Sequence, residues 1–241
     1  MEIINNIEVK NESINIIEIE DFLKEKEINF ILNSCKKFKK SKILDSENNN
    51  YRTSETCLLP NSIYNKYPII INIKKRIGRF LNINWLNIEH LQIVKYDKGQ
   101  EYKHHFDCFI PNTERYYKEN LHGGQRIYTC LIYLNNDFTG GETYFVNTNI
   151  KITPKKGKAI FWRNTNSQDN FPNMLSCHCG KPVKTGTKYA CNFFIRKNIF
   201  IHNKDIIKNN IDENINYQEN IDTDLIDYKP KITRTHNILL T

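Results

Sequence analysis

The stretch Tyr96-Asp-Lys-Gly-Gln-Glu-Tyr-Lys-His-His-Phe-Asp107 ends in a His-x-Asp triplet, His105-Phe106-Asp107. Alternate residues of a β-strand point to the same face, so one imidazole and one carboxylate from this triplet can converge on one point. Two histidines and one carboxylate form the facial triad with which proteins hold Fe(II), and the triplet supplies two of these ligands. The candidate for the third ligand is His178, 71 residues after Asp107. The three residues together predict a metal site.

Other interpretations of these residues have to be weighed, because a lone His-x-Asp triplet can also lie on a surface strand. Cys177 and Cys179 flank His178 and raise the alternative of a structural zinc site, which usually closes its coordination with Cys and His. On a strand these two thiols point away from the face that His178 uses, which argues against zinc. His122 stands beside two glycines in an expected loop, and we do not count it as a ligand.

Short β-prone runs separated by turn residues recur along the chain. Strands are expected at about 13–19, 52–59, 88–95, 126–134, 142–147, 159–163 and 190–196. Strands this short and this regularly interrupted are typical of a sandwich or jelly roll. Two helices are expected among the first strands, one from an N-cap at Asp21 to about Lys37, the other over 68–81. Residues 110–124 contain Pro111-Asn112 and His122-Gly-Gly, which predicts a loop or lid.

Composition and charge divide the chain at about residue 200. The 241 residues carry a net charge of +8, and 39% of them are hydrophobic, which suffices for one large domain over 1–200. Residues 201–241 hold five basic and seven acidic side chains, so the first 200 residues carry +10. A basic body attracts anionic ligands or nucleic acid, although a solvated surface is the commoner cause. Residues 201–241 are rich in Asn, Asp and Ile, which predicts an extension that packs loosely or stays disordered.

The cysteines and the first residues bear on the compartment. An odd number of cysteines at irregular spacing predicts no disulfide framework; the seven are Cys35, Cys57, Cys108, Cys130, Cys177, Cys179 and Cys191. Residues 1–8 show no basic segment followed by a long apolar run, so no secretory signal is visible. No segment approaches the ~18 apolar residues of a membrane span. We therefore expect a soluble, cytoplasmic protein in a reducing compartment, without a membrane partner.

Further motifs stand in a fixed order around the triplet and His178. They are Arg52-Thr53-Ser54, Thr139-Gly140-Gly141-Glu142-Thr143, the run from Pro154 to Trp162, and Lys188 ten residues after His178. In this order they resemble the prolyl 4-hydroxylase family of 2-oxoglutarate- and Fe(II)-dependent dioxygenases, over about Ile16 to Arg196. The resemblance implies an α+β, mainly β fold: a double-stranded β-helix (jelly roll) core with N-terminal supporting helices.

The same resemblance implies roles for individual residues. The catalytic set is His105, Asp107, His178 and Lys188, of which the first three bind Fe(II). Lys188 pairs with the distal carboxylate of 2-oxoglutarate, a partner that a buried charge requires. The hydroxyls of Tyr96 and Thr129 are assigned to 2-oxoglutarate as well, whereas Tyr133 lines the same pocket or belongs to the core. Glu142 is expected to hold a turn, and Trp162 to belong to the core rather than the pocket wall.

The reaction implied by the resemblance converts 2-oxoglutarate and O₂ to succinate and CO₂ and hydroxylates peptidyl proline to 4-hydroxyproline, with L-ascorbate as a further cofactor. Collagen-like and other proline-rich chains form polyproline II helices, which dock in aromatic-lined grooves. The aromatic candidates are Tyr51, Tyr102, Phe106, Tyr116 and Tyr117. A lysyl hydroxylase, a nucleic-acid demethylase and a non-catalytic binding module stay open. Lysine rather than arginine at position 188 favours the collagen-type prolyl group and argues against nucleic acid.

Overall fold

The computed structural model describes residues 13–41, 51–59, 68–166, 170–200 and 232–239. The strands are β1 Ser13–Ile19, β2 Lys39–Lys40, β3 Glu55–Leu59, β4 Leu91–Tyr96, β5 Tyr102–His105, β6 Arg126–Tyr133, β7 Thr139–Gly140, β8 Thr143–Phe145, β9 Ile150–Ile152, β10 Ala159–Arg163, β11 His178–Gly180, β12 Val183–Thr185, β13 Lys188–Arg196 and β14 Ile232–Leu239. The helices are α1 Glu25–Ser34, α2 Pro68–Leu81 and α3 Glu114–Asn120, with 3-10 turns η3 Trp85–Asn87 and η4 Met174–Ser176.

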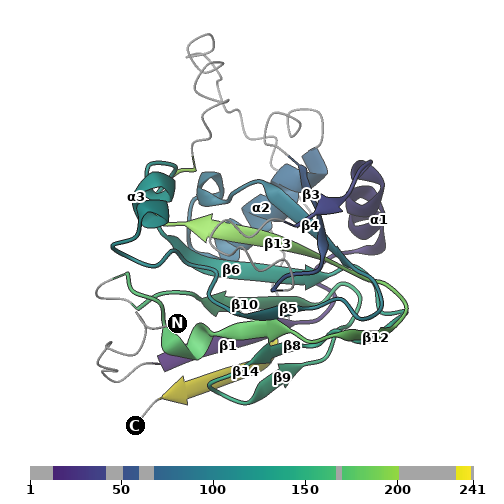
Figure 1. Cartoon of the computed structure of the whole chain (residues 1–241). Coiled ribbons are helices and arrows are strands. Elements are labelled where there is room, and N and C mark those ends of the chain that lie inside the picture. The colour runs from purple at the N-terminus through teal and green to yellow at the C-terminus, as the bar shows by residue number, and fades with distance from the viewer. Residues whose placement is uncertain (1–12, 42–50, 60–67, 167–169, 201–231, 240–241) are drawn as a thin grey trace.

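Two antiparallel sheets face each other and form the expected jelly roll (Figure 1). The larger sheet has eight strands in the order β14-β1-β10-β6-β13-β4-β3-β2, and the smaller one has the order β5-β11-β8-β9. A short pair, β12-β7, lies beside them. The fold class predicted from the sequence is therefore confirmed.

The large sheet separates two apolar layers. One layer packs its outer face against α1 and α2, with Ile31, Ile73 and Phe193 among its members. The other fills the space between the two sheets and includes Ile16, Phe145 and Trp162. Because successive residues of a strand alternate between faces, β13 sends Cys191 and Phe193 to the helices and Lys188 and Ala190 to the inner space. The candidate site lies in this inner space.

Helix α1 is shorter at both ends than its sequence pattern predicts. It begins after Lys24, whose backbone N–H donates to the Glu27 carboxylate at 2.8 Å, so the expected cap at Asp21 is wrong. Asp21 instead lies in a turn with φ of 52°. The buried carboxylate of Glu27 also pairs with Arg76 of α2 at 2.6 Å, which anchors the two helices to each other. Helix α2 occupies the predicted range.

A disulfide follows directly after the C-terminus of α1. Cys35, the first residue after the helix, forms a disulfide with Cys57 of β3, so the prediction of no disulfide is corrected. The bond joins the segment after α1 to the large sheet, and Cys35 itself has extended backbone angles, so the helix does not reach the expected end at Lys37. The five other cysteines, all among the described residues, are free.

The double substitution Cys35→Ser/Cys57→Ser should lower the free energy of unfolding. Closing a loop of 22 residues restricts the unfolded chain, and a link of this length contributes about 3 kcal/mol. Urea unfolding of the double variant measures this loss, with Cys177→Ser, at a free and half-buried cysteine, as the control. Equal stability of the parent and the double variant would show that the disulfide does not stabilise the fold.

Two segments expected to lack regular structure contain some. Residues 110–124, predicted as a loop, include α3, whose N-cap Thr113 accepts a hydrogen bond from the Tyr116 N–H at 3.2 Å. In the tail, β14 pairs with β1 along its length, and His236 Nε2 lies 3.1 Å from Glu18 Oε1. The expectation of a loosely packed tail is therefore wrong for 232–239, whereas 201–231 lie outside the described residues.

The prediction of no membrane-spanning segment can be compared with the helices of the structure. No helix in the described part of the chain is long and apolar enough to cross a membrane. The first twelve residues, on which the expected lack of a secretory signal rests, lie outside the described residues.

Candidate active site

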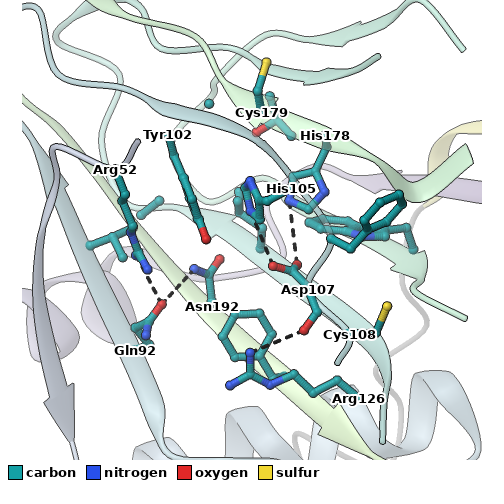
Figure 2. A pocket seen from close by; sticks show the side chains of 18 of the residues that line it. Arg52, Gln92, Tyr102, His105, Asp107, Cys108, Arg126, His178, Cys179 and Asn192 are labelled. Atoms are coloured by element: carbon teal, nitrogen blue, oxygen red, sulfur yellow. Dashed lines mark hydrogen bonds and ion pairs between the residues drawn. The ribbon is translucent and has the colours of Figure 1, made fainter. Parts of the chain in front are cut away.

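His105, Asp107 and His178 meet at one point between the sheets. The Nε2 atoms of His105 and His178 lie 3.5 Å and 3.7 Å from the two oxygens of Asp107, and the three ligand atoms are all within 4.8 Å of one another. Strands β5 and β11 are hydrogen-bonded neighbours with His178 opposite His105, so strand register unites residues far apart in sequence. Figure 2 shows both imidazoles turned toward the carboxylate. The structure thus brings together the three predicted ligands.

Backbone carbonyls orient both imidazoles. His105 Nδ1 lies 2.7 Å from the Lys103 carbonyl oxygen, and His178 Nδ1 lies 2.9 Å from that of Ser176. A carbonyl can only accept a hydrogen bond, so each Nδ1 carries the proton and each Nε2 offers its lone pair to the centre of the triad. Metal-binding histidines are commonly held in this way.

The charge state of the triad also suits a cation. Burial raises the pKa of Asp107, but His178, His105 and the Thr129 hydroxyl outweigh burial and hold this pKa well below its usual range. Burial, with His105 beside it, lowers the pKa of His178 to about 4. At neutral pH the site therefore holds an ionised carboxylate and a neutral His178, which are the forms that bind metals.

The hydroxyl of Thr129 contacts the carboxylate of the triad. Its hydroxyl donates to Asp107 Oδ2 at 2.7 Å, and the residue is fully buried, outside the residues that line the cavity. The hydroxyl has one proton, and it donates this proton in the hydrogen bond to Asp107. The structure thus places the Thr129 hydroxyl on the carboxylate of the triad, and its expected contact with 2-oxoglutarate stays a prediction.

Lys188 lies in the same cavity as the triad, which has a volume of about 250 Å³. It stands opposite Tyr96 in the register of β13 and β4, and its ammonium lies 5.1 Å from the centre of the Tyr96 ring. Only 3% of the residue is exposed, and Nζ donates to the Gly141 carbonyl at 2.6 Å. Burial lowers the pKa of Lys188 to about 8, although Glu142 opposes the shift. A buried ammonium in a cavity is suited to an anionic ligand.

The Thr-Gly-Gly-Glu-Thr motif explains how Lys188 is seated. Gly141 has a φ of 66°, and a Cβ there would approach Cδ of Lys188 to 3.0 Å. Glycine is thus required both by the backbone and by the close passage of the lysine. The Thr143 hydroxyl, at the end of the motif, hydrogen-bonds the buried Tyr133 hydroxyl at 2.8 Å, so Tyr133 belongs to the core.

The Arg-Thr-Ser segment reaches the triad through an aromatic ring. Tyr102 stacks on His105 with ring centres 3.5 Å apart, and the Arg52 guanidinium lies 4.6 Å from the centre of the Tyr102 ring. Arg52 also donates to the Ser54 hydroxyl at 2.9 Å and to Gln92 at 3.5 Å, as Figure 2 shows for Gln92. This wall of the cavity is therefore both cationic and aromatic.

Sequence reasoning missed a buried ion cluster behind Asp107. Glu89 pairs with Arg126 at 2.6 Å and with Arg196, and these two cations outweigh burial and lower the pKa of Glu89 to about 2. Arg126 also donates to the backbone carbonyl of Asp107 at 3.4 Å (Figure 2). Two arginines at the ends of the apolar runs 126–134 and 190–196 were the signal that could have indicated this cluster.

The other residues singled out from the sequence do not join the triad. The sulfur of Cys179 points away from Asp107 (Figure 2), and the metal-ligand group found among the described residues contains neither Cys177 nor His122. Trp162 is buried, with its ring centre 4.8 Å from that of His178, and it lines the cavity. It is both core and cavity wall.

The donor set fits Fe(II). Two imidazole nitrogens and one carboxylate oxygen bind this ion from one side and leave coordination positions open for other ligands. A structural zinc site would close its coordination, usually with thiolates, and the metal-ligand group found among the described residues contains no cysteine. His105, Asp107 and His178 would hold the ion, with Lys188 in the same cavity.

Comparisons with known proteins agree with this site. Residues 91–196 match the model of the 2OG-Fe(II) oxygenase superfamily. The chain is 31% identical over 212 residues to prolyl 4-hydroxylase 1 of Arabidopsis thaliana, covering 79% of this chain and 71% of that protein. It is 32% identical to prolyl 4-hydroxylase subunit alpha-2 of Caenorhabditis elegans over 65% of its own length, but it spans only 28% of that longer protein.

A solved structure shows the same architecture. The viral collagen prolyl hydroxylase of Paramecium bursaria Chlorella virus-1, in its 2-oxoglutarate complex, superposes with a TM-score of 0.58 at 28% identity. The match covers 75% of this chain and 95% of that one. Taken with the triad and the buried lysine, these similarities show that the chain belongs to the prolyl 4-hydroxylase family of 2-oxoglutarate- and Fe(II)-dependent dioxygenases.

Proposed function

We propose that this protein hydroxylates peptidyl proline in collagen-like or other proline-rich chains, using Fe(II), 2-oxoglutarate, O₂ and L-ascorbate. The observation that carries the proposal is the shared cavity, in which a His-Asp-His triad and the buried ammonium of Lys188 lie together. The Arabidopsis relative, matched over most of its length, is named a prolyl 4-hydroxylase, and the viral neighbour is described as a collagen prolyl hydroxylase.

The surroundings of each site residue support a specific role in binding the metal or the cosubstrate. His105, Asp107 and His178 would hold Fe(II), which would supply the oxidative chemistry: one oxygen atom of O₂ goes to succinate as 2-oxoglutarate loses CO₂, and the other goes into the C–H bond. Lys188 binds the distal carboxylate of 2-oxoglutarate with a charge-assisted hydrogen bond, and the Tyr96 hydroxyl assists it. The ring of Tyr102 holds the His105 imidazole in its plane by stacking.

Aromatic side chains around the cavity suit a proline-rich substrate. Phe106 and Tyr102 line the cavity, and Tyr51 meets Tyr102 edge to face at 6.4 Å. Tyr116 and Tyr117 stand on α3, and 60% of Tyr117 is exposed. Polyproline II helices dock on such aromatic surfaces because they are already ordered before binding.

Turnover with defined substrates tests the proposal. Purified protein with Fe(II) and 2-oxoglutarate should form succinate faster when a Pro-Pro-Gly or other proline-repeat peptide is added. Mass spectrometry should then show one added oxygen atom per modified proline. Binding to DNA would not identify the substrate class, because a positively charged domain binds DNA non-specifically with dissociation constants of about 10⁻⁴–10⁻⁶ M.

The control substrates are lysine-containing peptides without proline and methylated oligonucleotides, neither of which should stimulate succinate formation. Demethylation of an oligonucleotide, or hydroxylation of lysine, with no hydroxyproline from any proline-rich peptide, would contradict the proposed substrate class.

A further inference from the structure

Asn164, the residue directly after β10, is fully buried and touches the supports of two ligands of the triad. Its side-chain nitrogen Nδ2 donates to the Thr129 hydroxyl at 2.9 Å, and that hydroxyl donates to Asp107 Oδ2 at 2.7 Å. Its backbone carbonyl lies 3.3 Å from the hydroxyl of Ser176, which has a nearer acceptor in the Asn173 carbonyl at 2.7 Å, and the carbonyl of Ser176 accepts from His178 Nδ1. No other part of the site described above uses this residue.

The directions of the two side-chain hydrogen bonds follow from the donors available. An ionised carboxylate only accepts, so the single proton of the Thr129 hydroxyl goes to Asp107. Thr129 can then only accept from Asn164, and the amide nitrogen at 2.9 Å provides that donor. The amide oxygen of Asn164 lies farther from the hydroxyl, at 3.3 Å. The donors and acceptors therefore allow one arrangement: Asn164 donates to Thr129, and Thr129 donates to Asp107.

These two hydrogen bonds matter because a carboxylate can bind a cation through one oxygen or through both. An oxygen that already accepts a hydrogen bond is less available to the cation. Asp107 is held in this way at Oδ2, while Oδ1 accepts nothing from Thr129. The open coordination positions on which the proposed reaction depends require that the carboxylate use only one oxygen.

We propose that Asn164 is a positioning residue of the metal site, which acts through the Thr129 hydroxyl to hold one oxygen of Asp107 and so favours metal binding through the other. The backbone carbonyl of Asn164 is the same in any side-chain variant without proline, so such variants isolate the amide. The inference rests on the proposed function only in requiring that the triad bind a divalent metal.

Titration of the metal-free protein with Co(II), followed by the visible absorption of the bound ion, tests the proposal. Thr129→Val, of nearly the same size, removes the hydroxyl, and we expect Co(II) to bind about 10–100-fold more weakly with an altered spectrum. Thr129→Ser keeps the hydroxyl and should restore the parent spectrum and affinity. Asn164→Leu, also matched in size, should weaken binding by about 10-fold and change the spectrum in the same sense as Thr129→Val.

The double variant Thr129→Val/Asn164→Leu distinguishes positioning from a merely structural role. If Asn164 acts through Thr129, the double variant binds Co(II) as Thr129→Val does, because residues in one network are not additive. Multiplied losses, or parent-like binding by Asn164→Leu, would overturn the inference. Should Asn164→Leu not fold, the Thr129 pair still decides: equal spectra for Thr129→Val and the parent overturn it. Failure of the parent itself to bind Co(II) would instead count against the proposed function.

Discussion

His178→Ala is expected to abolish succinate formation and to weaken metal binding by more than about 100-fold, beyond the 10–100-fold loss typical of residues that only support a ligand. His178 contributes one of three protein donors, and its Nε2 is already turned toward Asp107 at 3.7 Å. Removing it leaves one imidazole and one carboxylate, which cannot hold Fe(II) from three sides. The loss should therefore appear in iron occupancy as well as in turnover.

The matched control is His104→Ala, which removes an exposed imidazole next to His105. This variant should keep its iron and its activity, since the described contact of His104 is made by its backbone carbonyl, which accepts from the Tyr51 hydroxyl. Iron content by elemental analysis and succinate by mass spectrometry provide the two measurements, with circular dichroism to confirm that both variants fold. Full activity in His178→Ala would sink the assignment of the third ligand.

The metal site could be predicted from the sequence because its signal is local. The triplet His105-Phe106-Asp107 places two ligands only two residues apart in the sequence, although β5 ends at His105 and Asp107 lies just beyond it. The third ligand depended on the resemblance, because no periodicity in the sequence pairs β11 with β5. The register between β11 and β5 brings His178 beside His105, and this register is a property of the folded sheets.

Three features that the sequence did not predict have no local signal. Strand β14 is exposed at Ile232 to Thr235 and is held to β1 by backbone pairing, so it lacks the apolar alternation by which a strand is recognised. The hydrogen bond from Thr129 to Asp107 was not predicted, because the direction of a hydroxyl depends on which acceptor lies closer in space. The disulfide of Cys35 and Cys57 joins residues 22 apart whose proximity depends on the path of β2 and β3.

Lys188→Ala should weaken the binding of 2-oxoglutarate while leaving metal binding nearly unchanged. A charge-assisted hydrogen bond contributes about 1.5–3 kcal/mol, which corresponds to roughly 10–150-fold in the dissociation constant. Lys188 lines the cavity but is not among the three grouped metal ligands. Calorimetry with 2-oxoglutarate and titration with Co(II) measure the two effects separately, and Lys184→Ala, at an exposed lysine of β12, is the control.

The pH dependence of binding provides a second readout of the same residue. Because burial lowers the pKa of Lys188 to about 8, the ammonium is present below that pH and is lost above it. The affinity of the parent for 2-oxoglutarate should therefore be constant from about pH 6 to 7 and fall as the pH rises through 8 toward 9. Lys188→Ala should lack this fall, and Lys188→Arg, which keeps its charge throughout, should lack it too. Equal binding of 2-oxoglutarate by Lys188→Ala and the parent at neutral pH would show that Lys188 is not its partner.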